Sequence, residues 1–179
     1  MTAPGRAPGP LVVLTGPPGA GKTAVGKLLS DRLRTSFVDT DAEIEASMGK
    51  PVGDIFVDDG EVAFRDLERA AADRALGADG AVVALGSGAV LDPEVQERLA
   101  GQPVAYLSAD FGSIAKRLGL DRPRVIIPGN PRGRLRAMLE ERRPVYERLA
   151  TFTVDAGELA PEEIADEIEA WLAEGSPAS

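Results

Sequence analysis

The sequence predicts an α/β protein in which a five-stranded parallel sheet lies between two layers of helices. Two features of the chain support this prediction. Five apolar segments of three to five residues alternate with longer segments whose apolar residues recur at helical spacing. Short apolar strands that alternate with helices are typical of a parallel sheet covered on both faces. The chain has 179 residues, a length that suits one domain with a substantial core.

The first half of the chain begins this alternation. Leu11–Thr15 is a short apolar run with β-branched residues, as expected for a buried strand. Apolar residues recur every three or four positions in Lys22–Arg34, which predicts a helix. The same criteria predict a strand over Ser36–Val38, a helix over Asp41–Met48, a helical turn over Val52–Phe56, a break at Gly60, a helix over Glu61–Leu76 and a strand over Ala81–Leu85.

The second half continues the pattern. Asp92 and Pro93 are typical first residues of a helix, and we expect one that ends at Leu99. The apolar residues of Pro161–Leu172 lie on one face and predict the last helix. Between these helices we expect strands over Val104–Leu107 and Phe152–Val154, a helix over Asp110–Leu118, a loop over Gly119–Gly133 and a helix over Arg134–Leu149 that is interrupted at Pro144.

We expect a single domain over residues 11–174. Residues 1–10 are rich in Pro and Gly and are expected to form a flexible N-terminal segment, and residues 175–179 a loose tail. Residues 49–78 are expected to be an insertion in the alternating pattern. Residues 119–133, a polar stretch with three prolines, are expected to form a mobile loop.

Composition excludes several classes of function. The chain has no Cys and no His, which excludes disulfide scaffolds, zinc-thiolate sites and catalysis by a histidine base. The net charge of −9 disfavours nucleic acid as a partner. The apolar runs are too short to span a membrane, and the first ten residues lack the apolar stretch of a secretory signal. We therefore expect a cytoplasmic protein that binds neither nucleic acid nor membrane.

One segment of this acidic chain is basic. Between Lys116 and Arg148 the sequence has ten basic and four acidic residues. Such a segment suits a small anionic ligand. The alternative is an arginine-rich helix face that is only solvated.

Gly16–Thr23 reads GPPGAGKT and fits the phosphate-binding loop G-x-x-x-x-G-K-[ST], with a strand before it and a helix after it. In such a loop the backbone N–H groups of Gly19, Ala20 and Gly21 approach phosphate oxygens, helped by the helix N-terminus. Lys22 would reach the β- and γ-phosphates, and the Thr23 hydroxyl would bind Mg²⁺.

Two other interpretations of this loop explain fewer of its residues. An ordinary Gly-rich turn needs neither Lys22 nor Thr23, and neither does the dinucleotide pattern G-x-G-x-x-A that Gly19–Ala24 also matches. A GTPase would need an N-K-x-D element, but none of the four lysines has Asp two residues later. The chain is also short for a motor or transport ATPase. A small-molecule kinase fits best.

An arginine near the end of the chain is expected to face inward. On the helix that ends at Leu149, the apolar stripe runs through Leu135 and Leu139 and continues through Arg142 to Tyr146. An arginine in this position needs a carboxylate or phosphate partner. The alternative to a ligand is a structural ion pair.

Several motifs in chain order resemble the shikimate kinases. After the phosphate-binding loop come Val38-Asp39-Thr40-Asp41, then Ile55-Phe56, Asp59-Gly60-Glu61 and Phe64-Arg65, then Leu85-Gly86-Ser87-Gly88-Ala89-Val90, Arg122-Pro123 and Arg142-Arg143-Pro144-Val145-Tyr146. The resemblance covers roughly residues 11–172. It implies a P-loop NTPase fold of the nucleoside-monophosphate-kinase type, in which residues 49–78 bind the substrate and residues 119–133 form a mobile lid.

The two aspartates of this resemblance have distinct expected roles. Asp39 ends a strand that we expect beside the phosphate-loop strand, where its carboxylate can hold Mg²⁺ together with Thr23. Asp41 is the best candidate to orient or deprotonate the attacking hydroxyl, since the chain has no histidine. The alternative for either residue is a cap on the next helix, and one residue can do both.

The resemblance also implies ligands for the substrate carboxylate and for ATP. Arg65, Arg142 and the backbone of Gly86, Ser87 and Gly88 would hold the carboxylate. The family usually has three glycines in that loop, so Ser87 is a departure, acceptable where φ is negative. Arg122 matches the lid arginine that meets the transferring phosphate, with Arg124 as a rival. Arg117 matches the residue that stacks on adenine, and surface placement is its alternative.

Together these features imply a monomeric kinase that uses ATP and Mg²⁺ to phosphorylate the 3-hydroxyl of shikimate. A related sugar-acid kinase, such as gluconate kinase, would share the phosphate loop, the metal and an anionic acceptor. A nucleotide-binding regulator without turnover would keep Gly16–Thr23 but would not need Asp41, Arg65 and Arg142 together.

Overall fold

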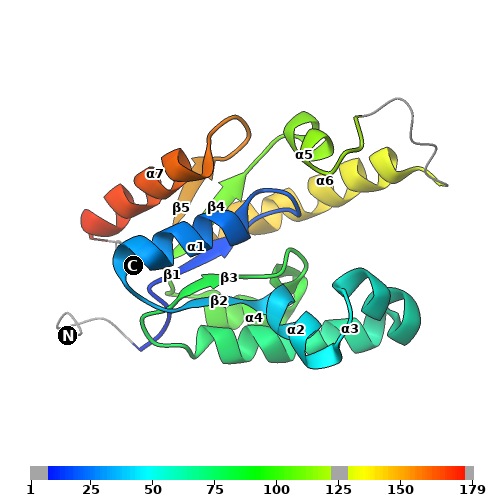
Figure 1. Ribbon diagram of the computed structural model, residues 1–179, viewed down its shortest axis with the longest axis horizontal. Coiled ribbons are helices and arrows are strands. Elements are labelled where there is room, and N and C mark those ends of the chain that lie inside the picture. The colour runs from blue at the N-terminus through cyan, green and yellow to red at the C-terminus, as the bar shows by residue number, and fades with distance from the viewer. Residues whose placement is uncertain (1–7, 122–128, 176–179) are drawn as a thin grey trace.

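A parallel sheet of five strands forms the centre of the protein. The computed structural model describes residues 8–121 and 129–175. The strands lie in the order β2-β3-β1-β4-β5, and every pairing is parallel (Figure 1). Their bounds are β1 (Val12–Thr15), β2 (Phe37–Asp39), β3 (Val82–Ala84), β4 (Val104–Ser108) and β5 (Phe152–Asp155). The predicted five-stranded parallel fold is confirmed.

Helices follow the strands as the sequence predicts. Their bounds are α1 (Lys22–Leu33), α2 (Thr40–Met48), α3 (Val52–Leu76), α4 (Pro93–Leu99), α5 (Phe111–Arg117), α6 (Pro131–Leu149) and α7 (Pro161–Ala173), with a short 3-10 helix η1 at Ala89–Leu91. Asp92 caps α4 by accepting hydrogen bonds from the backbone N–H groups of Glu94 and Val95. The capping interpretation of Asp92 is therefore confirmed. Among the described residues, no helix is both long and apolar enough to cross a membrane.

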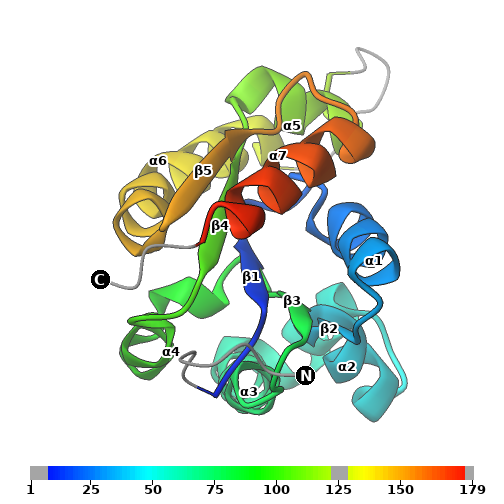
Figure 2. The same ribbon diagram turned by 90° about the vertical axis from the view of Figure 1, so that its left-hand side faces the viewer.

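Helices cover both faces of the sheet (Figure 2). Side chains of a strand alternate between the two faces. Val12 and Leu14 of β1 accordingly pack in a core cluster with α1, α5, α7 and the first half of α6. Val13 packs in a second cluster with α3, α4 and Tyr146 of α6. The helix α6 thus contributes to both layers.

The insertion predicted at residues 49–78 consists mainly of α3. This helix changes direction at Gly60, where φ is 87° and ψ is 166°, a backbone conformation that favours glycine. A small third core, formed by Ile44, Ile55, Phe64 and Ala71, joins α2 to α3. The predicted break at Gly60 is therefore a kink between two helical parts.

Three expectations about local structure were wrong. The helix α6 is continuous through Pro144, because packing holds it on both sides of the proline: Leu135 and Leu139 lie in one core cluster and Tyr146 in the other. It also begins at Pro131, where Asn130 accepts a hydrogen bond from the Gly133 backbone, so the last residues of the predicted loop are helical. Finally, β2 does not lie beside β1, since β3 lies between them.

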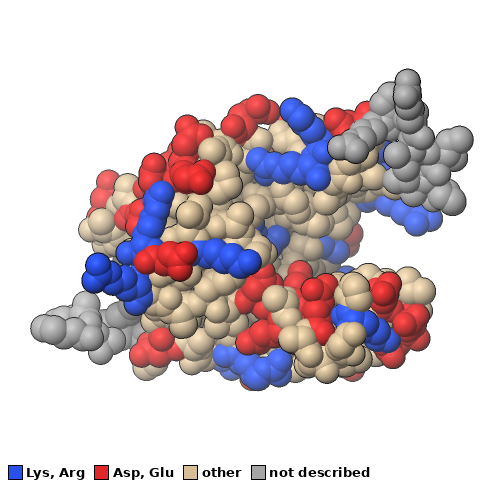
Figure 3. Space-filling model, viewed as in Figure 1, with Lys and Arg blue, Asp and Glu red and all other residues tan. Residues whose placement is uncertain are grey.

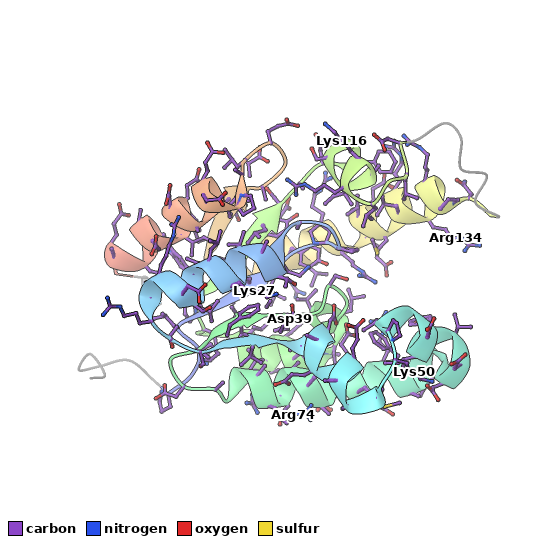
Figure 4. The ribbon with its side chains drawn as sticks, viewed as in Figure 1. Lys27, Asp39, Lys50, Arg74, Lys116 and Arg134 are labelled. Carbon is purple, nitrogen blue, oxygen red and sulfur yellow. The ribbon has the colours of Figure 1, made fainter. Side chains whose placement is uncertain are left out.

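A cleft opens at the carboxyl ends of the strands. In Figure 1 the first parts of α3 and α6 extend beyond the sheet as two arms. In Figure 3 the surface is hollowed between these arms, and basic side chains are visible inside the hollow. Figure 4 shows Arg134 on the α6 arm and Lys50, in the connection just before α3, beside the other arm. Ligands of open parallel sheets bind at this edge.

Some predicted segments lie outside the described residues. These are residues 1–7 of the predicted N-terminal segment, residues 122–128 of the predicted lid and residues 176–179 of the predicted tail.

Candidate active site

The phosphate-binding loop connects β1 to α1, as the sequence predicts. Gly19 and Gly21 have φ values of 80° and 96°, which an L side chain rarely adopts, so glycine is needed at both positions. Lys22 is the first residue of α1, and its Nζ donates hydrogen bonds to the carbonyls of Gly16 (2.8 Å) and Pro17 (3.0 Å). Burial lowers the pKa of the Lys22 ammonium to about 8, against the opposing effect of nearby carboxylates. A cation thus lies within the loop that would receive phosphates.

Asp39 connects the phosphate-binding loop to α2. Its Oδ2 accepts a 2.6 Å hydrogen bond from Oγ1 of Thr23, and its Oδ1 accepts bonds from the backbone N–H groups of Asp41 and Ala42 at 3.1 Å. In Figure 4, Asp39 lies where β2 meets α2. The helix-cap interpretation of Asp39 is therefore correct, and its other carboxylate oxygen contacts Thr23, the residue with which it is predicted to hold Mg²⁺.

Asp41 lies in the first turn of α2 and faces the loop that follows β3. A Cβ placed on Gly86 would lie 2.7 Å from Oδ1 of Asp41, so the carboxylate is packed directly against that glycine. Burial raises the pKa of the Asp41 carboxyl to about 6, while the charge of Lys22 acts to lower it. Asp41 is therefore close enough to Lys22 for their charges to interact.

The loop over Gly86, Ser87 and Gly88 is held at the centre of the cleft, because β3 lies between β1 and β2. The Gly86 N–H donates to Oγ1 of Thr40 at 2.8 Å, and the Tyr146 hydroxyl donates to the Ser87 carbonyl at 2.6 Å. Ser87 does not have a positive φ, so its departure from glycine costs no backbone strain.

Arg142 faces this loop, as the apolar stripe of its helix predicts. Its Nη1 donates a 3.2 Å hydrogen bond to Oγ of Ser87. Its Nε is buried and has no hydrogen-bond partner among the described residues. An unpaired buried donor is costly, so this guanidinium is suited to an anion that is not part of the described protein.

Arg65 approaches the same loop from α3. Its Nη1 donates a 2.6 Å hydrogen bond to Oε2 of Glu68, and a Cβ on Gly88 would lie 2.1 Å from that nitrogen. A side chain at Gly88 would therefore displace the guanidinium. Two arginines from different helices thus approach neighbouring residues of one loop.

Glu68 was missed by the sequence analysis. It is only 3% exposed, and besides binding Arg65 it lies against Gly86 and Gly88. The signal was present, because Glu68 lies four residues after the buried Phe64 and four before the buried Ala72, on the apolar face of α3. Glu68, like Arg142, is a charged residue in the apolar stripe of its helix and therefore needs an oppositely charged partner.

Arg117 contacts the middle of the phosphate-binding loop. Its guanidinium donates to the carbonyls of Gly19 (3.1 Å), Ala156 (2.5 Å) and Gly157 (3.0 Å). It therefore joins the phosphate-binding loop to the segment between β5 and α7. Arg122 and Arg124, the two candidates for the lid arginine, lie outside the described residues.

Known proteins share both the sequence and the fold of this chain. A family model described as Shikimate kinase matches residues 18–173, which include every helix from α1 to α7. The shikimate kinase of Thermobifida fusca is 54% identical over 157 residues, 88% of this chain and 91% of the relative. That of Salinispora tropica is 46% identical over 163 residues, 91% of this chain and 98% of the relative.

A solved structure gives the same result. The shikimate kinase from Acinetobacter baumannii in complex with shikimate matches the present structure with a TM-score of 0.83 and 31% identity, and the match covers 94% of each chain. Sequence and structure therefore agree over nearly the whole length of the protein. The chain belongs to the shikimate kinase family.

Proposed function

We propose that this protein transfers the γ-phosphoryl group of ATP to the 3-hydroxyl of shikimate. The observation that carries the proposal is that Arg65, Arg142 and Asp41 all meet the Gly86–Gly88 loop, and that the charges of Asp41 and Arg142 act on Lys22. This arrangement combines a site for an acceptor carboxylate with a site for phosphates. The family membership and the resemblance of the A. baumannii enzyme, which was solved with shikimate, support the choice of acceptor.

The phosphate-binding loop would hold the nucleotide. Backbone N–H groups of Gly19, Ala20 and Gly21 would donate to phosphate oxygens, and the N-terminus of α1 favours that negative charge. Lys22 would exchange its carbonyl partners for phosphate oxygens and neutralise charge as the phosphoryl group transfers. Arg117 would lie beside the adenine, and Arg122 of the lid would approach the phosphoryl group.

Thr23 and Asp39 fit a magnesium site. Their side-chain oxygens are 2.6 Å apart, and oxygen donors are what Mg²⁺ prefers. No group of three or more His, Cys, Asp or Glu that could hold a metal occurs in the described part of the chain. Mg²⁺ usually keeps waters and phosphate oxygens and takes few ligands from the protein, so two side-chain oxygens are enough for the proposed site. When bound with ATP, Mg²⁺ would neutralise charge on the β- and γ-phosphates.

Asp41 would act on the acceptor hydroxyl. Because its pKa is about 6, it is ionised at neutral pH and can accept a hydrogen bond from that hydroxyl. Arg65 and Arg142 would bind the shikimate carboxylate and so fix the ring relative to Asp41. Positioning of this kind supplies much of the rate in phosphoryl transfer.

The proposal is tested by ADP release from Mg·ATP with and without shikimate, with gluconate as a parallel acceptor. We expect release that depends on shikimate and is lost in Lys22→Ala. Lys27→Ala is the matched control, because Lys27 is an exposed lysine on the same helix (Figure 4), and it should retain activity. Turnover with gluconate alone would identify a sugar-acid kinase. A folded protein that binds ATP without turnover of either acceptor would be a nucleotide-binding regulator.

The assembly and partners of the protein are also part of the proposal. We expect a monomer without nucleic-acid or membrane partners, and the net charge of −9 disfavours binding to nucleic acid. Light scattering of the purified protein during chromatography measures its mass. A stable dimer would contradict this expectation.

A further inference from the structure

Ser87, the middle residue of the Gly86–Gly88 loop, has room for a side chain, whereas its two neighbours do not. A Cβ on Gly86 would meet Asp41 at 2.7 Å, and one on Gly88 would meet Arg65 at 2.1 Å. Ser87, by contrast, is half-buried and its hydroxyl contacts Arg142. Of the three residues in this loop, Ser87 alone contributes a polar side chain to the site.

We propose that the Ser87 hydroxyl is a positioning group for Arg142 and thereby sets the affinity for the acceptor carboxylate. The inference rests on the proposed function. A guanidinium carries its N–H donors in a fixed plane, so an acceptor that holds Nη1 also determines where Nε points. Ser87 Oγ accepts from Nη1 at 3.2 Å, and Nε is the buried donor that lacks a partner in the described chain. The hydroxyl thus leaves Nε available to the carboxylate.

The charges around Arg142 explain why the hydrogen bond to Ser87 is needed to hold this side chain in place. Arg142 lies near Lys22, since the charge of Arg142 contributes to the lowered pKa of that lysine. Repulsion between the two cations would move the flexible arginine side chain away from the cleft. The Ser87 backbone is itself anchored, because its carbonyl accepts the 2.6 Å hydrogen bond from Tyr146, one turn after Arg142 on α6. The hydrogen bond from Arg142 therefore ends on a residue whose own backbone is held in place.

The test compares wild type with Ser87→Ala and Ser87→Gly in steady-state kinetics. Both variants remove the hydroxyl, and only Ser87→Gly also loosens the backbone. We expect the KM for shikimate to rise about fivefold in each, the size of effect of one modest hydrogen bond. Both kcat and the KM for ATP should stay at wild-type values, because neither Lys22 nor Asp41 contacts the hydroxyl.

Two further measurements distinguish positioning from general damage. In an Arg142→Lys background, Ser87→Ala should change the KM for shikimate by less than twofold, because the group that the hydroxyl positions is gone. With the methyl ester of shikimate, which lacks the carboxylate charge, Ser87→Ala should have a similarly small effect. Thermal denaturation of each variant checks that it is folded. If Ser87→Gly is unstable, Ser87→Ala alone tests the role of the hydroxyl.

The outcomes separate this inference from the proposed function. If wild type phosphorylates shikimate and Ser87→Ala leaves the KM unchanged or lowers it, the positioning role is wrong and the proposed function stands. A rise in KM that persists in the Arg142→Lys background also overturns the role. If wild type does not use shikimate, the proposed function fails and this inference fails with it.

Discussion

Thr23 donates a 2.6 Å hydrogen bond to Asp39, which lies 16 residues further along the chain and caps α2 with its other carboxylate oxygen. One side chain therefore joins the phosphate-binding loop to the helix that carries Asp41. The two roles of Asp39 can be separated experimentally because they need different properties of the side chain. A helix cap needs only a hydrogen-bond acceptor, whereas a magnesium site also needs negative charge.

Asp39→Asn should leave the fold intact and weaken the binding of Mg²⁺. Asparagine caps helices as well as aspartate does, so the free energy of unfolding should change little. The Mg²⁺ concentration for half-maximal activity should rise by about 10- to 100-fold. Asp39→Ala, the control, should in addition lose about 1 kcal/mol of stability with the cap. A magnesium titration unchanged in Asp39→Asn would exclude Asp39 from the metal site.

Arg142→Lys should raise the KM for shikimate by about 10- to 100-fold with little change in the KM for ATP. Lysine keeps the charge but not the planar set of donors that suits a carboxylate. Arg143→Lys is the matched control, because Arg143 is the next residue on α6 and is exposed. Steady-state kinetics with each substrate varied in turn measure both constants. Equal effects of the two substitutions would show that general charge, rather than Arg142, binds the substrate.

Glu68→Gln should also raise the KM for shikimate, by about threefold to tenfold. The carboxylate of Glu68 accepts a 2.6 Å hydrogen bond from Nη1 of Arg65 and so keeps this arginine beside Gly88. A neutral amide would hold the arginine less firmly. Glu61 is the control, since it lies 3.8 Å from Arg65 but its side chain is 66% exposed. Glu61→Gln should have almost no effect, because exposed ion pairs contribute little. If Glu61→Gln is the more damaging change, Glu68 does not position Arg65.

The value of kcat/KM for shikimate should fall as the pH falls through about 6. Burial raises the pKa of Asp41 to about 6, and a protonated carboxyl can no longer accept the hydroxyl proton. A pH profile between about pH 5 and 8 measures this, at saturating Mg·ATP. The same midpoint should remain in Arg142→Lys, where Asp41 still titrates. An acidic limb near pH 4, the range of an ordinary carboxyl, would assign the base role to another group.

Asp41→Asn should inactivate the enzyme and stabilise its fold. Because the pKa of Asp41 in the folded protein lies above the ordinary value of 3.8, the ionised form is disfavoured on folding, and stability is lost as the pH rises from about 4 through 6. At about pH 7.5 the substitution should raise the free energy of unfolding by up to about 3 kcal/mol. The gain should be roughly half as large at about pH 5. Urea denaturation at both pH values measures it, and equal gains would contradict the raised pKa.

Local sequence patterns were sufficient for much of the fold. The phosphate-binding loop is contiguous from Gly16 to Thr23, and the residues that precede and follow it form β1 and α1 as predicted. Arg142 could be placed facing inward because an apolar stripe on a helix has a known period. The order of the strands could not be predicted in this way, since pairing joins segments far apart in the chain. The expected neighbour of β1 was β2, whereas in the structure β3 lies between these two strands.

The sequence by itself determined which residue types are available to the site and the family to which the chain belongs. Only the tertiary structure decided how those residues meet. Arg142 and Ser87 are 55 residues apart, and their contact exists because β3 ends at the carboxyl edge of the sheet, the edge beyond which α6 begins before running back along the sheet. Periodicity reports which face of a helix is buried, but it does not report what lies opposite that face. The period of α3 was enough to place Glu68 on the buried face of the helix, but its pairing with Arg65 is visible only in the structure.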